Sequence, residues 1–292
     1  MKKKLGLFLI LAFGIDWALW LATAAAAGPI SEGAAVWNFV APVSMFGPLA
    51  AALAVQQIGG DDVDRGWRPR LRGNARLYLA AWFVPATLAI AGAALYFLAV
   101  PSDFDGSASA YSQAAQAQLG VGPDQVSLAL AVQVASSIVL APLFNMFLAI
   151  GEEAGWRGFL YPALQGFLSK PAAAVASGLI WGAWHAPLIA MGYNYGVDYT
   201  GFPVAGIAMM MVACAAFGTF LCYLREKSAS VWTCALAHGA FNATAGVGLY
   251  VSLGASTIMG PSPLGLVGFI PSLALAVWYA RRMKDCVRVR EM

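Results

Sequence analysis

The chain has 292 residues, of which 60% are hydrophobic and only 11% are charged. Soluble domains carry about a quarter charged residues, so this composition excludes an ordinary soluble protein and is typical of one that crosses a membrane repeatedly. The net charge of +3 gives no indication of nucleic-acid binding, and we expect no nucleic-acid partner.

The first segment, MKKKLGLFLILAFGIDWALWLATAAAAG, combines a basic start with a long apolar run. A cleaved signal peptide has the same order of features but a shorter apolar part, and Asp16 interrupts this one. We therefore expect a retained first membrane helix, although its cleavage would leave the other spans unchanged. Asp16 is expected to form an interhelical hydrogen bond or lie near water, and a proton site is the alternative.

Apolar runs of about 20 residues, long enough to cross a membrane as a helix, recur along the whole chain. Eight are predicted: 5–27, 35–57, 77–100, 128–156, 172–191, 204–224, 230–252 and 264–280. The sequence thus predicts an all-α, polytopic integral membrane protein with a single transmembrane domain over residues 1–292. The Ser-, Ala- and Gln-rich segment 101–124 is expected to be a long loop.

All 17 Lys and Arg residues fall on one side of these spans. They precede the first span, separate the second from the third and the sixth from the seventh, follow the fourth, and fill the C-terminal tail. Because Lys and Arg accumulate in cytoplasmic loops, the distribution predicts that both termini are cytoplasmic. The basic residues are also expected to meet the anionic headgroups of membrane lipids.

Two adjacent glutamates, Glu152 and Glu153, lie in a strongly apolar stretch near the end of the fourth predicted span. A carboxylate at the centre of a spanning helix costs about 2.5–3.5 kcal/mol on insertion, so it normally faces a protein-lined cavity. Arg157 follows Glu153 by four residues, in the favourable order for an ion pair. Glu152 points about 100° away and lacks such a partner, which makes it the candidate reactive group.

The only two histidines, His185 and His238, both fall inside predicted spans. A single histidine there is more often a packing residue, but here neither is found in a loop. Asn242 follows His238 by four residues and leaves the same helix face. For Glu152 to reach the depth of the histidines, the fourth helix must continue through GWRGFLYPAL to about residue 160 or beyond.

Other polar and aromatic residues flank these positions. Asn145 is on the same helix face as Glu152 and could line a cavity, although such residues more often form hydrogen bonds between helices. Trp156, Trp181 and Trp184 could shape a pocket for an apolar peptide, and ordinary aromatic packing is the alternative.

Three short patterns follow one another in the second half of the chain: E-E-x-x-x-R from Glu152, aromatic-x-x-x-H ending at His185, and H-x-x-x-N from His238. In this order they resemble the CPBP family, which comprises the CAAX proteases and bacteriocin-processing enzymes and is also called the Abi family. Each pattern alone is weak, but three in order on a polytopic chain are specific. The family-like core covers about residues 128–252. The family usually has phenylalanine where this chain has Trp181, a change that keeps an aromatic wall.

The resemblance implies an intramembrane endopeptidase, similar to type II CAAX prenyl proteases, in a bacterial or archaeal plasma membrane. It also implies a role for each residue: Glu152 as general base, His185 as the imidazole that holds the water, His238 and Asn242 as the oxyanion hole, and Glu153 and Arg157 as supports of Glu152. Peptide hydrolysis needs such a base and such fixed donors. The expected substrate is a peptide or a lipidated peptide at the cytoplasmic leaflet.

A metal requirement is left open by the sequence. Glu152, His185 and His238 could bind a divalent ion such as zinc with an open position for water. The usual H-E-x-x-H spacing is absent, and the family has been interpreted both as glutamate-dependent and as metal-dependent.

Two other classes of function remain as alternatives. Buried Glu and His residues also mark proton- or metal-coupled transporters, which would spread such groups along a path to both faces. An inactive membrane scaffold of the same family would use the polar cluster only to join its helices, and it would tolerate Glu152→Gln.

Overall fold

The computed structural model describes residues 1–59, 63–254 and 256–284. Within these ranges the protein is built from helices joined by turns and loops, and contains no β-strand. The α-helices are α1 (Lys2–Ala27), α2 (Ala34–Ser44), α3 (Gly47–Gly59), α4 (Ala75–Ala99), α5 (Ser109–Leu119), α6 (Val126–Val139), α7 (Ala141–Gly155), α8 (Tyr161–Leu164), α9 (Lys170–Trp184), α10 (Ala186–Ala190), α11 (Val204–Ser228), α12 (Val231–Thr244) and α13 (Ile270–Lys284). The predicted all-α class is confirmed.

Four helical segments of the described chain are long and apolar enough to cross a membrane. They are α1, the segment Ala34–Ile58 formed by α2 and α3, α4 and α11, and the bent pair of α6 and α7 is a fifth candidate. The protein is therefore polytopic and integral to a membrane. α9, α12 and α13 contain 15, 14 and 15 residues, about 21–23 Å at 1.5 Å per residue, against a hydrocarbon core of about 30 Å. Eight full spans and cytoplasmic termini stay predictions.

The fourth predicted span differs most from the structure. Instead of one helix over 128–156, the chain bends by 47° between Val139 and Ala141 and then stays helical to Leu164. Pro142 fits the first turn of α7 but cannot donate a backbone hydrogen bond to the preceding helix, so α6 ends there. The predicted continuation of this helix past residue 160 is confirmed, with a π-helix, η3, at Trp156–Leu160.

Other segments also differ from the sequence prediction, and the fifth predicted span, 172–191, is interrupted at His185 between α9 and α10. The expected loop at 101–124 contains α5, because Ala and Gln are good helix formers even without an apolar run. The seventh predicted span, 230–252, is not one helix, since α12 ends at Thr244 and a 3-10 helix, η4, follows at Val247–Val251.

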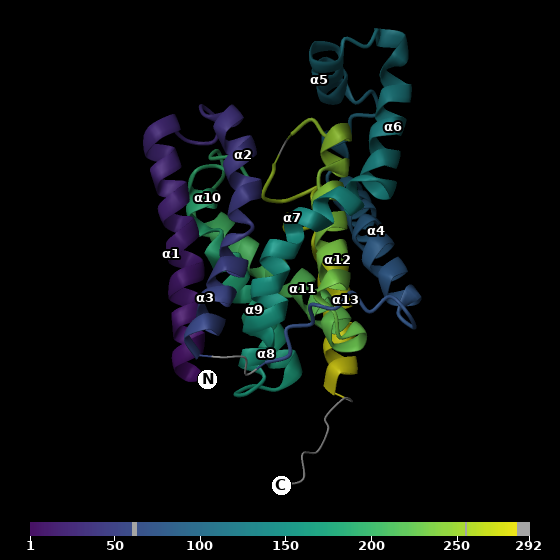
Figure 1. Cartoon of the computed structure of the whole chain (residues 1–292). Helices are drawn as coiled ribbons and strands as arrows, with labels where there is room; N and C mark the ends of the chain where they lie inside the picture. Colours follow the sequence, from purple (N-terminus) through teal and green to yellow (C-terminus); the bar gives the residue numbers. More distant parts are fainter. Residues whose placement is uncertain (60–62, 255, 285–292) are drawn as a thin grey trace.

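The two ends of the molecule differ in charge. Figure 1 shows the N-terminus, α8 and the last described turn of α13 at one end, and α5 at the other. The N-terminal lysines and the arginines at the end of α13 therefore share an end, as the predicted orientation requires.

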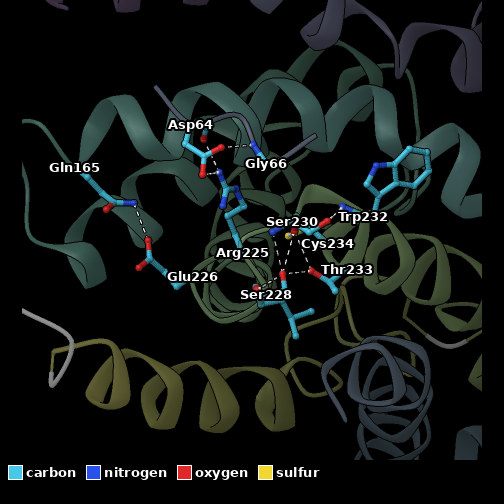
Figure 2. A network of polar contacts seen from close by, with 11 residues as sticks. Asp64, Gly66, Gln165, Arg225, Glu226, Ser228, Ser230, Trp232, Thr233 and Cys234 are labelled. Atoms are coloured by element: carbon cyan, nitrogen blue, oxygen red, sulfur yellow. Dashed lines mark hydrogen bonds and ion pairs between the residues drawn. The ribbon is translucent and has the colours of Figure 1, made fainter. Parts of the chain in front are cut away.

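A polar network at this basic end joins the loop after α3 to α11 and α12 (Figure 2). Arg225 donates to the backbone carbonyl of Asp64, and the carbonyl of Gly66 accepts from the N–H of Val231 at 2.9 Å. Trp232 donates through Nε1 to the carbonyl of Trp67 at 2.8 Å. These bonds anchor the start of α12, the helix that carries His238.

Small residues let the central helices approach closely. A Cβ at Gly239 of α12 would lie 2.5 Å from the backbone nitrogen of Met146 in α7. A Cβ at Gly182 of α9 would lie 2.3 Å from Cα of Met211 in α11. Such contacts are typical of helix packing in membranes. The first contact places α7, which carries the two glutamates, against α12, which carries His238, and the second places α9 against α11.

Candidate active site

One cavity of about 290 Å³ gathers the residues singled out in the sequence. It is lined by parts of α2, α7, α9, α11 and α12, and by the loop after α10. The four predicted catalytic residues all line it: Glu152, His185, His238 and Asn242. Asn145 also lines it. Three separate stretches of the chain thus meet at one cavity. From the sequence, this meeting could be inferred only from the order of the three patterns.

Glu152 sits on the cavity side of α7 with 3% of its surface exposed. Its Oε2 accepts hydrogen bonds from Nε1 of Trp181 at 2.6 Å and Nε1 of Trp156 at 3.2 Å. No cationic side chain of the described chain forms an ion pair with it. The carboxylate is therefore oriented by neutral donors, and its position just before a π-helix fits the frequent use of such segments at functional sites.

Glu153 lies on the core side of α7 and joins two positively charged or chargeable groups. Its Oε1 is 2.9 Å from Nη1 of Arg157, and both side chains are fully buried. The same oxygen is 2.9 Å from Nδ1 of His238. The predicted ion pair with Arg157 is confirmed, while its link to His238 was not predicted. Removing one partner of such a buried pair leaves an uncompensated charge, at a cost of about 3–5 kcal/mol.

His185 is placed at the point where α9 ends. Its Nδ1 lies 3.0 Å from the backbone carbonyl oxygen of Trp181. Since a carbonyl can only accept, Nδ1 must carry the proton in this bond. In the neutral ring Nε2 then keeps its lone pair and can accept a hydrogen bond inside the cavity.

Trp181 connects the parts of the site. Its indole bonds Glu152, its carbonyl accepts from His185, and its ring lies against Arg157 (4.4 Å) and His238 (5.1 Å). The sequence predicted only an aromatic wall here. Phenylalanine could not form the hydrogen bond that the indole N–H makes to the carboxylate. In the sequence, the only indication of this bond was that the position holds tryptophan.

The two asparagines differ in their surroundings. Asn242 lines the cavity with an exposed side chain that has no hydrogen bond to any described residue. Asn145 donates through Nδ2 to the carbonyl of Gly239 at 3.4 Å. Asn145 therefore forms the interhelical bond that the sequence favoured, and it lines the cavity as well.

Some lining residues could not be found from the sequence. Tyr193 and Asn194, from the loop after α10, reach the cavity, and Phe217 and Phe241 form a stacked pair with ring centroids 4.2 Å apart. No motif marks them, because loop residues and apolar helix residues lack a pattern that points to a site. They give the cavity an apolar wall opposite its polar groups.

The candidate ligands do not assemble into a metal centre. In the part of the chain that the structure describes, no three His, Cys, Asp or Glu side chains are grouped closely enough to hold an ion. Nδ1 of His185 and Nδ1 of His238 each bond a protein oxygen, and Oε2 of Glu152 accepts from indole groups, so the ligand atoms left without a bond to described residues are the two Nε2 atoms and Oε1.

Comparison with known proteins relates part of the chain to a known family. Residues 134–244 match the family model of type II CAAX prenyl endopeptidase Rce1-like proteins. A protein of Methanococcus maripaludis named CAAX prenyl protease 2 is 41% identical to this chain over 54 residues. That alignment covers 18% of this chain and 20% of the relative, so the chain spans about a fifth of that relative's length. The four cavity residues predicted as catalytic lie within 134–244, whereas α1 to α4 lie outside it.

Proposed function

We propose that this chain is an intramembrane endopeptidase, because residues 134–244 match the family model of Rce1-like type II CAAX prenyl endopeptidases. It hydrolyses a peptide bond near the cytoplasmic side of the membrane. The observation that carries the proposal is the single cavity that is lined by Glu152, His185, His238 and Asn242.

Glu152 activates the attacking water. One of its oxygens, Oε2, is held by two indole N–H groups, while Oε1 has no hydrogen bond from the described residues. Oε1 takes a proton from water as the oxygen attacks the peptide carbonyl carbon, and Nε2 of His185 accepts the water's other hydrogen bond. The carboxyl group then returns its proton to the leaving amine nitrogen. General base catalysis of this kind contributes about 10²–10⁴-fold.

His238 and Asn242 stabilise the oxyanion that forms on the carbonyl oxygen. The amide of Asn242 is a neutral donor at the open part of the cavity. Because Nδ1 of His238 bonds Glu153, Nε2 is the ring nitrogen left for the oxyanion, to which it donates in the imidazolium form. One fixed donor to an oxyanion contributes about 10²–10³ in kcat.

The substrate is a peptide, and the apolar wall favours one with a bulky apolar group. Phe217, Phe241 and Leu188 offer such a surface beside the polar groups. A lipidated peptide presented from the inner leaflet would meet both requirements, and membrane lipids are the surrounding partners. The setting we propose is the plasma membrane of a bacterium or archaeon.

The test compares peptide pools from membranes that carry the wild type, Glu152→Gln or Glu32→Gln. Glu32 is exposed and lies in the loop between α1 and α2, so its substitution is a matched control. We expect products that appear with the wild type and Glu32→Gln and vanish with Glu152→Gln. Identical pools from all three would reject the endopeptidase and favour the inactive scaffold.

A further inference from the structure

The first helix contacts the candidate active site although it lies outside the matched segment. Nε1–H of Trp17 donates to the backbone carbonyl of Trp184, the residue directly before His185, at 2.9 Å. The indole Nε1–H of Trp184 in turn lies 3.1 Å from Oδ2 of Asp16 and 3.3 Å from the carbonyl oxygen of Ala12. Both the carbonyl and the indole of Trp184 are therefore held by α1.

The end of α9 needs such donors. α9 ends at Trp184, and Pro187 follows in the first turn of α10. The last four carbonyls of a helix have no N–H partner within that helix, so they accept from donors elsewhere. The ring of His185 supplies one donor and the indole of Trp17 supplies another. The point at which His185 leaves the helix thus depends on a residue of α1.

Asp16 is buried, with 1% of its surface exposed, in a strongly apolar span. A carboxylate in such a place persists when hydrogen bonds or dipoles compensate its charge. The indole of Trp184 is one such partner. The second is the start of α3, because a Cβ at Gly47 would lie only 2.0 Å from Oδ2 of Asp16. Oδ1 of Asp16 has no hydrogen-bond partner among the described residues, so what α3 offers the carboxylate is the positive end of its helix dipole.

The same corner also packs against the helix of Glu152. A Cβ at Gly155 would lie 2.4 Å from Cβ of Pro48, and one at Gly151 would lie 2.5 Å from the carbonyl oxygen of Met45. The turn between α2 and α3 therefore packs on α7 directly beside Glu152. α1 and α3 together contact both the glutamate helix and the histidine helix.

We propose that Asp16 and Trp17 are positioning residues that set the place of His185 in the cavity. The consequence for hydrolysis rests on the proposed function, whereas the effect on the imidazole does not. Misplacing a reacting group by about 1 Å can cost 10²-fold in rate. Loss of the two hydrogen bonds next to His185 could shift its imidazole by such a distance and therefore lower the rate of hydrolysis.

A matched pair of substitutions on α1 tests this role. Trp17→Phe keeps an aromatic ring and removes the N–H that bonds Trp184. Trp20→Phe makes the same change on the same helix, where the ring also packs on Trp184 at 4.7 Å. The Nε1 of Trp20 has no hydrogen-bond partner among the described residues, so its loss breaks no bond. Asp16→Leu and Asp16→Asn form a second pair, since asparagine keeps an oxygen acceptor.

The first readout needs no substrate. Because the chain has only two histidines, hydrogen–deuterium exchange at each imidazole C2–H can be followed separately by mass spectrometry in the full-length protein. We expect Trp17→Phe and Asp16→Leu to change the half-life at His185 by about threefold or more. His238 should be unchanged, and Trp20→Phe and Asp16→Asn should match the wild type at both histidines.

The second readout is hydrolysis of a peptide identified from the comparison of peptide pools. Trp17→Phe should lower kcat by about 10–100-fold with KM within about twofold, because the substitution displaces a reacting group rather than a binding surface. An unchanged half-life at His185 in Trp17→Phe overturns the positioning role. A changed half-life in a protein that cleaves no peptide supports the positioning role and rejects the endopeptidase, so the two failures are distinguishable.

Discussion

On the cavity side of α7, Glu152 accepts hydrogen bonds from two neutral indoles. On the core side, its neighbour Glu153 is bound by Arg157 and His238 and is fully buried. Consecutive helix residues point about 100° apart, so one Glu-Glu doublet can supply both environments. The difference shows that the presence of a counter-ion decides the role of each carboxylate. A carboxylate paired with a cation joins helices, whereas an unpaired carboxylate that lines a cavity can take a proton.

The largest effect is expected from a substitution on the cavity side of α7, which should abolish activity and leave the fold intact. Glu152→Gln keeps the shape and can still accept from both indoles through its amide oxygen, but it cannot take a proton. We expect hydrolysis to fall by about 10³-fold or more, with a stability change below about 1 kcal/mol. Peptide cleavage and thermal unfolding in the same detergent measure the two quantities. A variant that unfolds at a much lower temperature would contradict this division.

The core side should show the opposite result, a loss of fold. Glu153→Gln leaves the guanidinium of Arg157 buried without its partner, and Arg157→Met leaves the carboxylate, so each should destabilise by about 3–5 kcal/mol. The double substitution should recover part of that loss, because no buried charge is then left unpaired. Denaturant unfolding of the four proteins in a double-mutant cycle measures the coupling, and additive losses would show that the pair is not a unit.

A smaller effect is expected from the indole that orients Glu152. Trp181→Phe removes the 2.6 Å bond to Oε2 and keeps the ring against Arg157 and His238, while Trp156 still donates. We expect kcat to fall about tenfold, in line with one hydrogen bond to a charged group. Trp82→Phe removes an indole bond from α4 to the carbonyl of Ile138 in α6, and because neither helix lines the cavity it serves as the control for kcat.

The smallest effect concerns a half-buried carboxylate in a loop. Hydrogen bonds from Ser107 and Ser109 lower the pKa of Asp105, which lies in the loop before α5. A lowered folded-state pKa means that the contribution to stability is complete above the ordinary value of about 3.9 and is lost as pH falls below it. Amide exchange at the start of α5, corrected for the intrinsic rate, should rise in that acid range. In Asp105→Asn this dependence on pH should disappear.

Much of the site was predictable because its chemistry is unusual for a membrane helix. The spacing of Glu153 and Arg157 predicted their ion pair, and the depth of the histidines predicted that helix continues past residue 160. The indole bond of Trp181 and the link from His238 to Glu153 were not predictable. Both join residues on different helices, and their geometry depends on how closely glycine contacts let those helices approach.

The sequence by itself determined that the protein is helical, integral to a membrane, and equipped with a few ionisable groups in its apolar region, because inserting such groups is costly and makes them conspicuous. Only the tertiary structure decided which groups share the cavity, which are neutralised, and that Asp16 and Trp17 of α1 contact the residue beside His185. These decisions depend on contacts between segments as much as 172 residues apart. Neither periodicity nor local spacing carries information over such a separation.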